Sequence, residues 1–221
     1  PKQVGALTNW KNVACGQFHS LAVKTDGTLW AWGVNNYGAS GLGVGTNTYT
    51  RSPNQVGALT NWLSVVAGSY NSMAIKTDGT LWGWGINSGS LGLGNTTSYS
   101  SPVQVGALTN WKSIAYGTLA IKTDGTLWAW GSNSGGQLGL GNTTSYSSPK
   151  QVGALTNWAT ASINDHAAAV KTDGTLWTWG TGTYGALGLG NTTSYSSPKQ
   201  VGALTNWYSA CVMDGVIALR Y

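Results

Sequence analysis

The sequence predicts an all-β fold, a β-propeller built from four-stranded antiparallel blades. A segment of about fifty residues recurs along the chain, and a period of this length indicates a stacked array of units. Each copy also divides into short strand-like pieces that end at Gly or Asp-Gly. The string P-x-Q-V-G-A-L-T-N-W begins at Pro1, Pro53, Pro102, Pro149 and Pro198.

The first two strands of a repeat are expected, in the second copy, at 62–68 and 72–79. Both are short and rich in β-branched or small apolar residues, and no stretch of the chain has the 3.6-residue apolar period of a helix. The Thr-Asp-Gly turn that ends the second strand recurs in four copies. Because Gly adopts the positive φ of a tight turn, this tripeptide predicts a hairpin into the third strand.

The third strand, at 80–85, carries Leu-Trp-x-Trp-Gly. Trp82 and Trp84 point to one face of the sheet, and the leucine and the small residue point to the other. Both faces therefore look buried, as in a small sheet held between two copies of itself. All thirteen tryptophans lie at repeat positions and are predicted to pack between blades.

The fourth strand is expected at P-x-Q-V, with its proline at the strand start, where the missing N–H is tolerated best. Four antiparallel strands per repeat, stacked radially, make a β-propeller. About four and a half repeats are present, at 1–52, 53–101, 102–148, 149–197 and, partially, 198–221. We expect one repeat domain over 1–221.

Two stretches resemble the regulator of chromosome condensation repeat family. They are Gly-Gln-Phe-His-Ser-Leu-Ala-Val-Lys-Thr-Asp-Gly-Thr-Leu-Trp-Ala-Trp-Gly at 16–33 and Gly-Ser-Asn-Ser-Gly-Gly-Gln-Leu-Gly-Leu-Gly at 131–141. The resemblance extends over the whole chain, although the third copy is shortened near Tyr116 and the fourth loses a glycine near Ile163. It implies a propeller, commonly of seven blades, whose two chain ends share one blade. We therefore expect this chain to be part of a longer propeller; the rival is a five-blade ring with one incomplete blade.

The composition is poor in charge. Charged residues make up 8% of the chain, far below the usual quarter, and glutamate does not occur. This composition favours an extracellular, cell-surface or virion protein. Eleven basic residues give a net charge of +5 but form no run, so we expect no nucleic-acid partner. No apolar run reaches the length of a membrane span, so we expect no membrane insertion.

Catalytic and metal-binding constellations are not recognisable in the sequence. The two histidines, His19 and His166, occupy the same repeat position, and a metal site needs three or more convergent ligands. Four of the six aspartates belong to the hairpin turns. We therefore expect no enzyme, no metal and no cofactor. Cys15 and Cys211 are either small buried strand residues or the two halves of a closure disulfide.

The copies differ most in two loops, one between the first and second strands and one after the third strand. In an up-and-down blade both loops emerge on one rim. Aromatic and amide side chains suit partner recognition, and the alternative is drift in loops that packing does not constrain. The candidate binding rim consists of Gln17, Phe18, His19, Asn36, Tyr37, Tyr70, Asn71, Gln137, Asn164, Asp165, His166, Tyr184 and Asp214.

Three functions are compatible with these observations. The leading hypothesis is a non-enzymatic binding or scaffold propeller, a recognition module of a microbial or viral surface with a protein or glycan partner. A guanine-nucleotide exchange factor for a small GTPase is the alternative that the family resemblance implies. A lectin with one sugar site per blade is the third, although no acid accompanies Tyr37 and Tyr184 in the loops.

Overall fold

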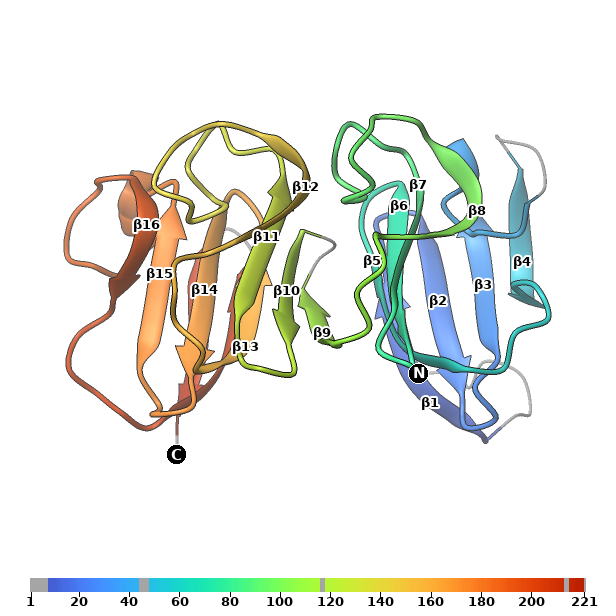
Figure 1. The fold of residues 1–221 in the computed structure, drawn as a ribbon, viewed down its shortest axis with the longest axis horizontal. Coiled ribbons are helices and arrows are strands. Elements are labelled where there is room, and N and C mark those ends of the chain that lie inside the picture. The colour runs from blue at the N-terminus through green and yellow to red at the C-terminus, as the bar shows by residue number, and fades with distance from the viewer. Residues whose placement is uncertain (1–7, 44–47, 116–117, 213–214, 221) are drawn as a thin grey trace. The chain divides into compact units, whose positions relative to one another are not determined.

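A computed structural model describes residues 8–43, 48–115, 118–212 and 215–220 (Figure 1). These residues form antiparallel sheets of consecutive strands, which confirms the predicted all-β fold of about four and a half blades. We number the sheets as blades 1 to 5. The chain divides into two compact units: the first holds blades 1 and 2, and the second holds blades 3 to 5 together with the loop Asn87–Thr97.

The strands follow one another in the same order in each blade. Blade 1 contains β1 (Trp10–Cys15), β2 (His19–Lys24), β3 (Leu29–Val34) and β4 (Tyr49–Gln55). The strands of blade 2 are β5 (Trp62–Ala67), β6 (Asn71–Lys76), β7 (Leu81–Gly85) and β8 (Tyr99–Gln104). A short 3₁₀ turn, η1 (Asn36–Gly38), follows β3.

The second unit repeats this arrangement. The strands of blade 3 are β9 (Trp111–Ala115), β10 (Leu119–Lys122), β11 (Leu127–Gly131) and β12 (Tyr146–Gln151). Those of blade 4 are β13 (Trp158–Ile163), β14 (His166–Lys171), β15 (Leu176–Gly180) and β16 (Tyr195–Gln200), with the 3₁₀ turn η2 (Thr183–Gly185) after β15. Blade 5 is the pair β17 (Trp207–Val212) and β18 (Val216–Arg220).

The prediction that proline begins the fourth strand is wrong. The fourth strand of blade 2 starts at Tyr99, and Pro102 lies inside it. The register between β7 and β8 breaks at this point, because Gly83 pairs with Val103 whereas Gly85 pairs with Tyr99. The strand is an edge strand, and a bulge there tolerates a residue without an N–H.

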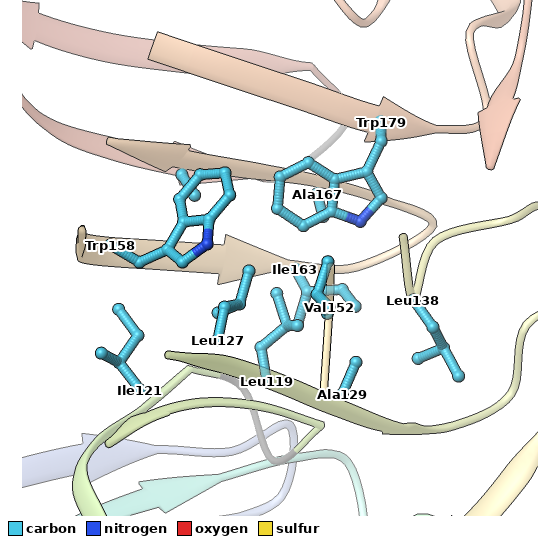
Figure 2. Packing of buried hydrophobic residues seen from close by; sticks show 11 residues of the cluster. Leu119, Ile121, Leu127, Ala129, Leu138, Val152, Trp158, Ile163, Ala167 and Trp179 are labelled. Atoms are coloured by element: carbon cyan, nitrogen blue, oxygen red, sulfur yellow. The ribbon is translucent and has the colours of Figure 1, made fainter. Parts of the chain in front are cut away.

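Indoles wedge one blade against the next, as predicted. In the second unit Trp158 and Trp179 of blade 4 lie over Leu119 and Leu127 of blade 3 (Figure 2). Trp158 meets Trp179 with ring centroids 6.1 Å apart and planes at 61°. The first unit has the same core, in which Trp62 and Trp84 of blade 2 pack against aliphatic residues of blade 1.

The loop after the third strand bonds to an indole of the next blade in three of the copies. In the first unit the Trp84 Nε1 donates to the carbonyl of Ala39 at 3.0 Å, and the Gly43 N–H donates to the carbonyl of Ser100 at 3.0 Å. A Cβ on Gly38 would lie 2.3 Å from the Ser100 Cα, so only glycine allows this approach. The loop Asn87–Thr97 makes the equivalent contact, because the Trp130 Nε1 donates to the Ser90 carbonyl at 2.9 Å. This loop therefore belongs to the second unit.

Each hairpin turn also positions an indole. In blade 2 the Thr80 hydroxyl donates to the Asp78 carboxylate at 2.6 Å and accepts from the Trp82 Nε1 at 2.8 Å. Hydrogen bonds from the Thr80 hydroxyl and N–H lower the pKa of Asp78. The Lys76 ammonium lies 3.6 Å from the centre of the Trp82 ring, and burial lowers its pKa. The same contacts recur in blades 1, 3 and 4, which explains why Lys-Thr-Asp-Gly-Thr-Leu-Trp is repeated as a unit.

A buried histidine joins blades 1 and 2. The Ser72 hydroxyl donates to the Ala39 carbonyl at 2.8 Å, so it accepts from the His19 Nε2 at 2.7 Å. The neutral ring therefore carries its proton on Nε2. The His19 Nδ1 is buried without a hydrogen-bond partner, and burial lowers the pKa of His19 to about 4.

The cysteines differ from both expectations. Cys15 and Cys211 are exposed free thiols, each in its own unit. They lie in β1 and β17, so their strand placement is as expected but their burial is not. Among the described residues, no helix is long and apolar enough to cross a membrane.

Thr80→Val tests the hydrogen-bond relay. The substitution preserves the shape of the side chain but leaves the Trp82 N–H without its acceptor, so the free energy of unfolding should fall by about 1–3 kcal/mol. Chemical denaturation followed by circular dichroism measures this change. Thr77→Val alters an exposed threonine of the same turn and should stay within about 0.5 kcal/mol. Equal losses in the two variants would contradict the relay.

His19 should make stability depend on pH. Its folded pKa of about 4 lies below the unfolded value of 6.5, so the unfolded chain binds more protons between these values. The contribution is complete above pH 6.5 and is lost as the pH falls towards 4, by about 3 kcal/mol in total. The denaturation midpoint of the wild type should therefore fall more steeply than that of His19→Asn as the pH is lowered through this range. Asn71 occupies the equivalent position in blade 2, so asparagine is the matched replacement. Parallel pH profiles would refute this role of His19.

Candidate functional site

The two variable loops of blade 1 lie side by side. His19 at the start of β2 pairs with Gly33 near the end of β3. The loop before β2 and the loop after β3 therefore emerge at the same end of the sheet, and the Val34 N–H donates to the Phe18 carbonyl at 2.8 Å. The loop between β5 and β6 of blade 2 is the third loop of this site, and it contains Tyr70.

Three aromatic side chains from these loops form one exposed cluster, which we call the rim cluster. Phe18 stacks on Tyr70, with ring centroids 5.1 Å apart and planes at 23°. Tyr37 meets Tyr70 edge to face at 5.7 Å and 76°. The side chains of Phe18 and Tyr37 are 42% and 49% exposed, and Tyr70 is half-buried. The sequence thus placed these residues on one rim, and the structure brings them into mutual contact.

The backbone at Tyr37 is strained. Its φ of 57° lies in the left-handed region, which a bulky residue rarely adopts. The buried Asn35 holds the turn, because its Oδ1 accepts from the Ser40 N–H at 3.0 Å and from the Ser40 hydroxyl at 2.5 Å. A strained residue that is fixed by its surroundings and exposes its side chain is a candidate for function.

Sequence reasoning did not include Asn35 and Ser40 in the site. Both are buried, and they fix the turn that presents Tyr37. The recurrence of Asn87 and Asn133 at the equivalent position of later copies was the available signal. Their Oδ1 atoms likewise accept backbone N–H groups of the same loop.

The rim cluster is surrounded by uncharged polar groups. Gln17 is exposed, and Asn36 and Asn71 are partly exposed. His19 is buried beneath them and hydrogen-bonded to Ser72, so it supports the loops but is not accessible to a partner. The cluster can stack against a ligand and exchange hydrogen bonds with it. The described part of the chain holds no group of three His, Cys, Asp or Glu side chains that could bind a metal ion.

The candidate residues of the second unit do not form such a cluster. Gln137 and His166 are buried, and Gln137 Oε1 accepts from the Gly135 N–H at 2.9 Å. Asn164 and Asp165 are exposed on the loop before β14. Tyr184 shares the φ of 57° of Tyr37, but its side chain is fully exposed. Asp214 lies outside the described residues.

Several proteins of known sequence share parts of this chain. Human HERC6, a probable E3 ubiquitin-protein ligase, is 38% identical over 92 residues, which is 40% of this chain and 9% of HERC6. Protein pim1 of Schizosaccharomyces pombe is 31% identical over 99 residues, which is 38% of this chain and 18% of pim1. The matches therefore span less than a fifth of either relative.

Solved structures share the fold over almost the whole chain. Human WBSCR16 superimposes with a TM-score of 0.81 and 25% identity over 96% of this chain and 58% of its own. Yeast RCC1 (Prp20), in its complex with Kap60, gives a TM-score of 0.85 and 20% identity over 99% of this chain and 56% of its own. These similarities confirm the RCC1-type propeller fold.

The repeat family itself is matched along the chain. The pattern of the regulator of chromosome condensation (RCC1) repeat fits residues 26–75, 78–119, 124–169 and 173–212, and a second pattern of the same repeat fits 10–39 and 62–89. The matched stretches contain the hairpin turns, the paired indoles and the loops described above. The chain therefore belongs to the RCC1 repeat family.

Proposed function

We propose that this chain is a non-enzymatic recognition module that binds a partner protein through the rim cluster. The observation that supports the proposal is the exposed contact of Phe18, Tyr37 and Tyr70 across two blades. Exposed aromatic residues are frequent anchors of protein interfaces, because each buries a large apolar area on binding.

The rim cluster is organised before a partner arrives. Phe18 and Tyr70 restrain each other by stacking, and hydrogen bonds to Asn35 fix the turn that carries Tyr37. Side chains that are already ordered lose little conformational entropy on binding. The low charge of the chain and its near-identical repeats favour a surface or adhesion-type module of microbial or viral origin.

Nucleotide exchange on a small GTPase is the less favoured function. Prp20p of Saccharomyces cerevisiae, a structural neighbour at 22% identity, was described with binding to Gsp1p and histones, but an identity at this level supports the fold alone. The rim cluster and its neighbours Gln17, Asn36 and Asn71 carry no charge. Complementary charge is what would steer a charged partner to this surface.

Binding to arrayed proteins tests the proposal. The chain would be screened by biolayer interferometry against purified extracellular domains and small GTPases, with nucleotide release measured for the latter. For each protein bound, the double variant Phe18→Ser/Tyr70→Ser should weaken the affinity by about tenfold or more, because two anchors lose their apolar contact area.

Tyr184→Ser is the matched control, since Tyr184 has the same backbone conformation and repeat position as Tyr37 but no place in the rim cluster. It should leave the affinity within about twofold of wild type. A panel in which nothing binds, or in which binding is insensitive to the double variant, would contradict the proposal. So would accelerated nucleotide release that persists in that variant.

Tyr184→Asn measures the backbone strain directly. Asparagine tolerates the left-handed region better than tyrosine, and the exposed Tyr184 side chain loses no buried contact. The free energy of unfolding should therefore rise by about 0.5–1 kcal/mol. Thermal and chemical denaturation would show it, with the exposed Tyr208→Asn in the regular strand β17 as a control that should not be stabilised. A destabilised Tyr184→Asn would show that the turn does not store strain.

A further inference from the structure

A cavity recurs at equivalent places in the two units, apart from the rim cluster. In the first unit it has a volume of ≈ 210 Å³ and is lined by Leu59, Trp62, Trp82, Ser101 and Pro102, among others. In the second unit it measures ≈ 260 Å³. Its equivalent lining residues there are Leu155, Trp158, Trp177, Ser197 and Pro198. We call these two cavities the junction pockets, because each lies where a blade meets its successor.

The walls of the junction pockets are aromatic and apolar. Trp62 meets Trp82 edge to face at 5.9 Å and 79°, so the two rings form a corner, and Trp158 and Trp177 repeat it at 6.2 Å and 80°. The Trp82 N–H already donates to Thr80, so this indole offers only its hydrocarbon surface. The leucine beside each corner remains about half exposed, 48% for Leu59 and 45% for Leu155.

The polar groups at the pockets are neutral. Ser101 and Ser197 are exposed and contribute hydroxyl groups, and glycines of the preceding blade also line each pocket. No charged side chain is among the described residues that line either pocket. Lys76 lies over the Trp82 ring but is buried and is not part of the wall. An ionic ligand would therefore lose hydration without gaining a counter-charge.

We propose that each junction pocket binds one ring of a neutral sugar. The C–H face of a pyranose is apolar and fits against the partly exposed indole of Trp82 or Trp177, beside the buried Trp62 or Trp158. Its hydroxyl groups can remain in water or bond to the serine hydroxyl. A small number of polar groups in a largely apolar, aromatic wall is the usual composition of a small-ligand site. The volumes lie below the ~300–1,000 Å³ typical of drug-sized ligands, so a single ring fits better than a stretch of peptide.

Recurrence of the pocket makes the site multivalent. Each unit contributes one described pocket with the same residue types, so the described residues offer two sites for the same sugar. Linked sites of low individual affinity gain avidity without any new contact. A polysaccharide with several neutral ends presents the sugar at a higher local concentration, so it should bind more strongly than the monosaccharide.

The test uses the full chain with defined sugars. Isothermal titration would be done with glucose, galactose, mannose and N-acetylglucosamine, and then with a neutral polysaccharide that displays the sugar bound. At least one sugar should bind with a Kd on the order of 1 mM. The double variant Ser101→Trp/Ser197→Trp fills both pockets and should weaken binding by about tenfold or more.

Ser52→Trp is the matched control, because Ser52 precedes Pro53 in blade 1 as Ser101 precedes Pro102 in blade 2. It should retain the wild-type affinity. Circular dichroism checks that the variants are folded. A second double variant, Leu59→Gln/Leu155→Gln, removes exposed apolar wall without adding bulk and should also weaken binding.

Two results would overturn the proposal: no binding of any of the four sugars, or sugar binding that survives both pocket variants. The rim variant Phe18→Ser/Tyr70→Ser separates this proposal from the proposed function. It should leave sugar binding intact, because Phe18 and Tyr70 do not line either pocket. Loss of sugar binding in this variant would assign the sugar to the rim and refute the junction pockets.

Discussion

The contact between two indoles of one blade and the aliphatic face of the preceding blade is the interaction on which the structure depends. A four-stranded sheet of this size has no core of its own, because both of its faces are apolar. Trp158 and Trp179 supply one side of the core, and Leu119 and Leu127 of the preceding blade supply the other (Figure 2). Stability is therefore a property of neighbouring pairs of blades rather than of single blades.

In blade 2 the paired indoles of the third strand link the core to both ends of the blade. At one end Trp82 is fixed by Thr80 and Asp78 of the hairpin turn; at the other, Trp84 donates to the carbonyl of Ala39 in the loop of the preceding blade. The loops of the rim are thus held by hydrogen bonds to the next blade. These hydrogen bonds let a strained residue such as Tyr37 keep one conformation. They also explain how the loops of the rim vary between copies while the interior does not.

The sequence predicted those features that depend on local chemistry. The hairpin at Thr-Asp-Gly, the paired indoles and the position of the variable loops all follow from the spacing of a few residue types, and Gly79 indeed has a φ of 75°. The start of the fourth strand was not predictable, because a bulge opposite Trp84 hides Pro102 inside an edge strand. Contacts between residues distant in sequence could not be predicted either. The hydrogen bond of His19 depends on Ser72, and the stacking of Phe18 depends on Tyr70.

The loop Asn87–Thr97 shows that the sequence repeat and the compact unit have different boundaries, since this loop leaves blade 2 and fastens to blade 3. Among the described residues, blades 2, 3 and 4 each receive such a loop from the copy before them. Deletion or duplication of one whole repeat by recombination would join a donor loop to an equivalent acceptor. The chain can therefore change its number of blades during evolution without creating a new kind of contact.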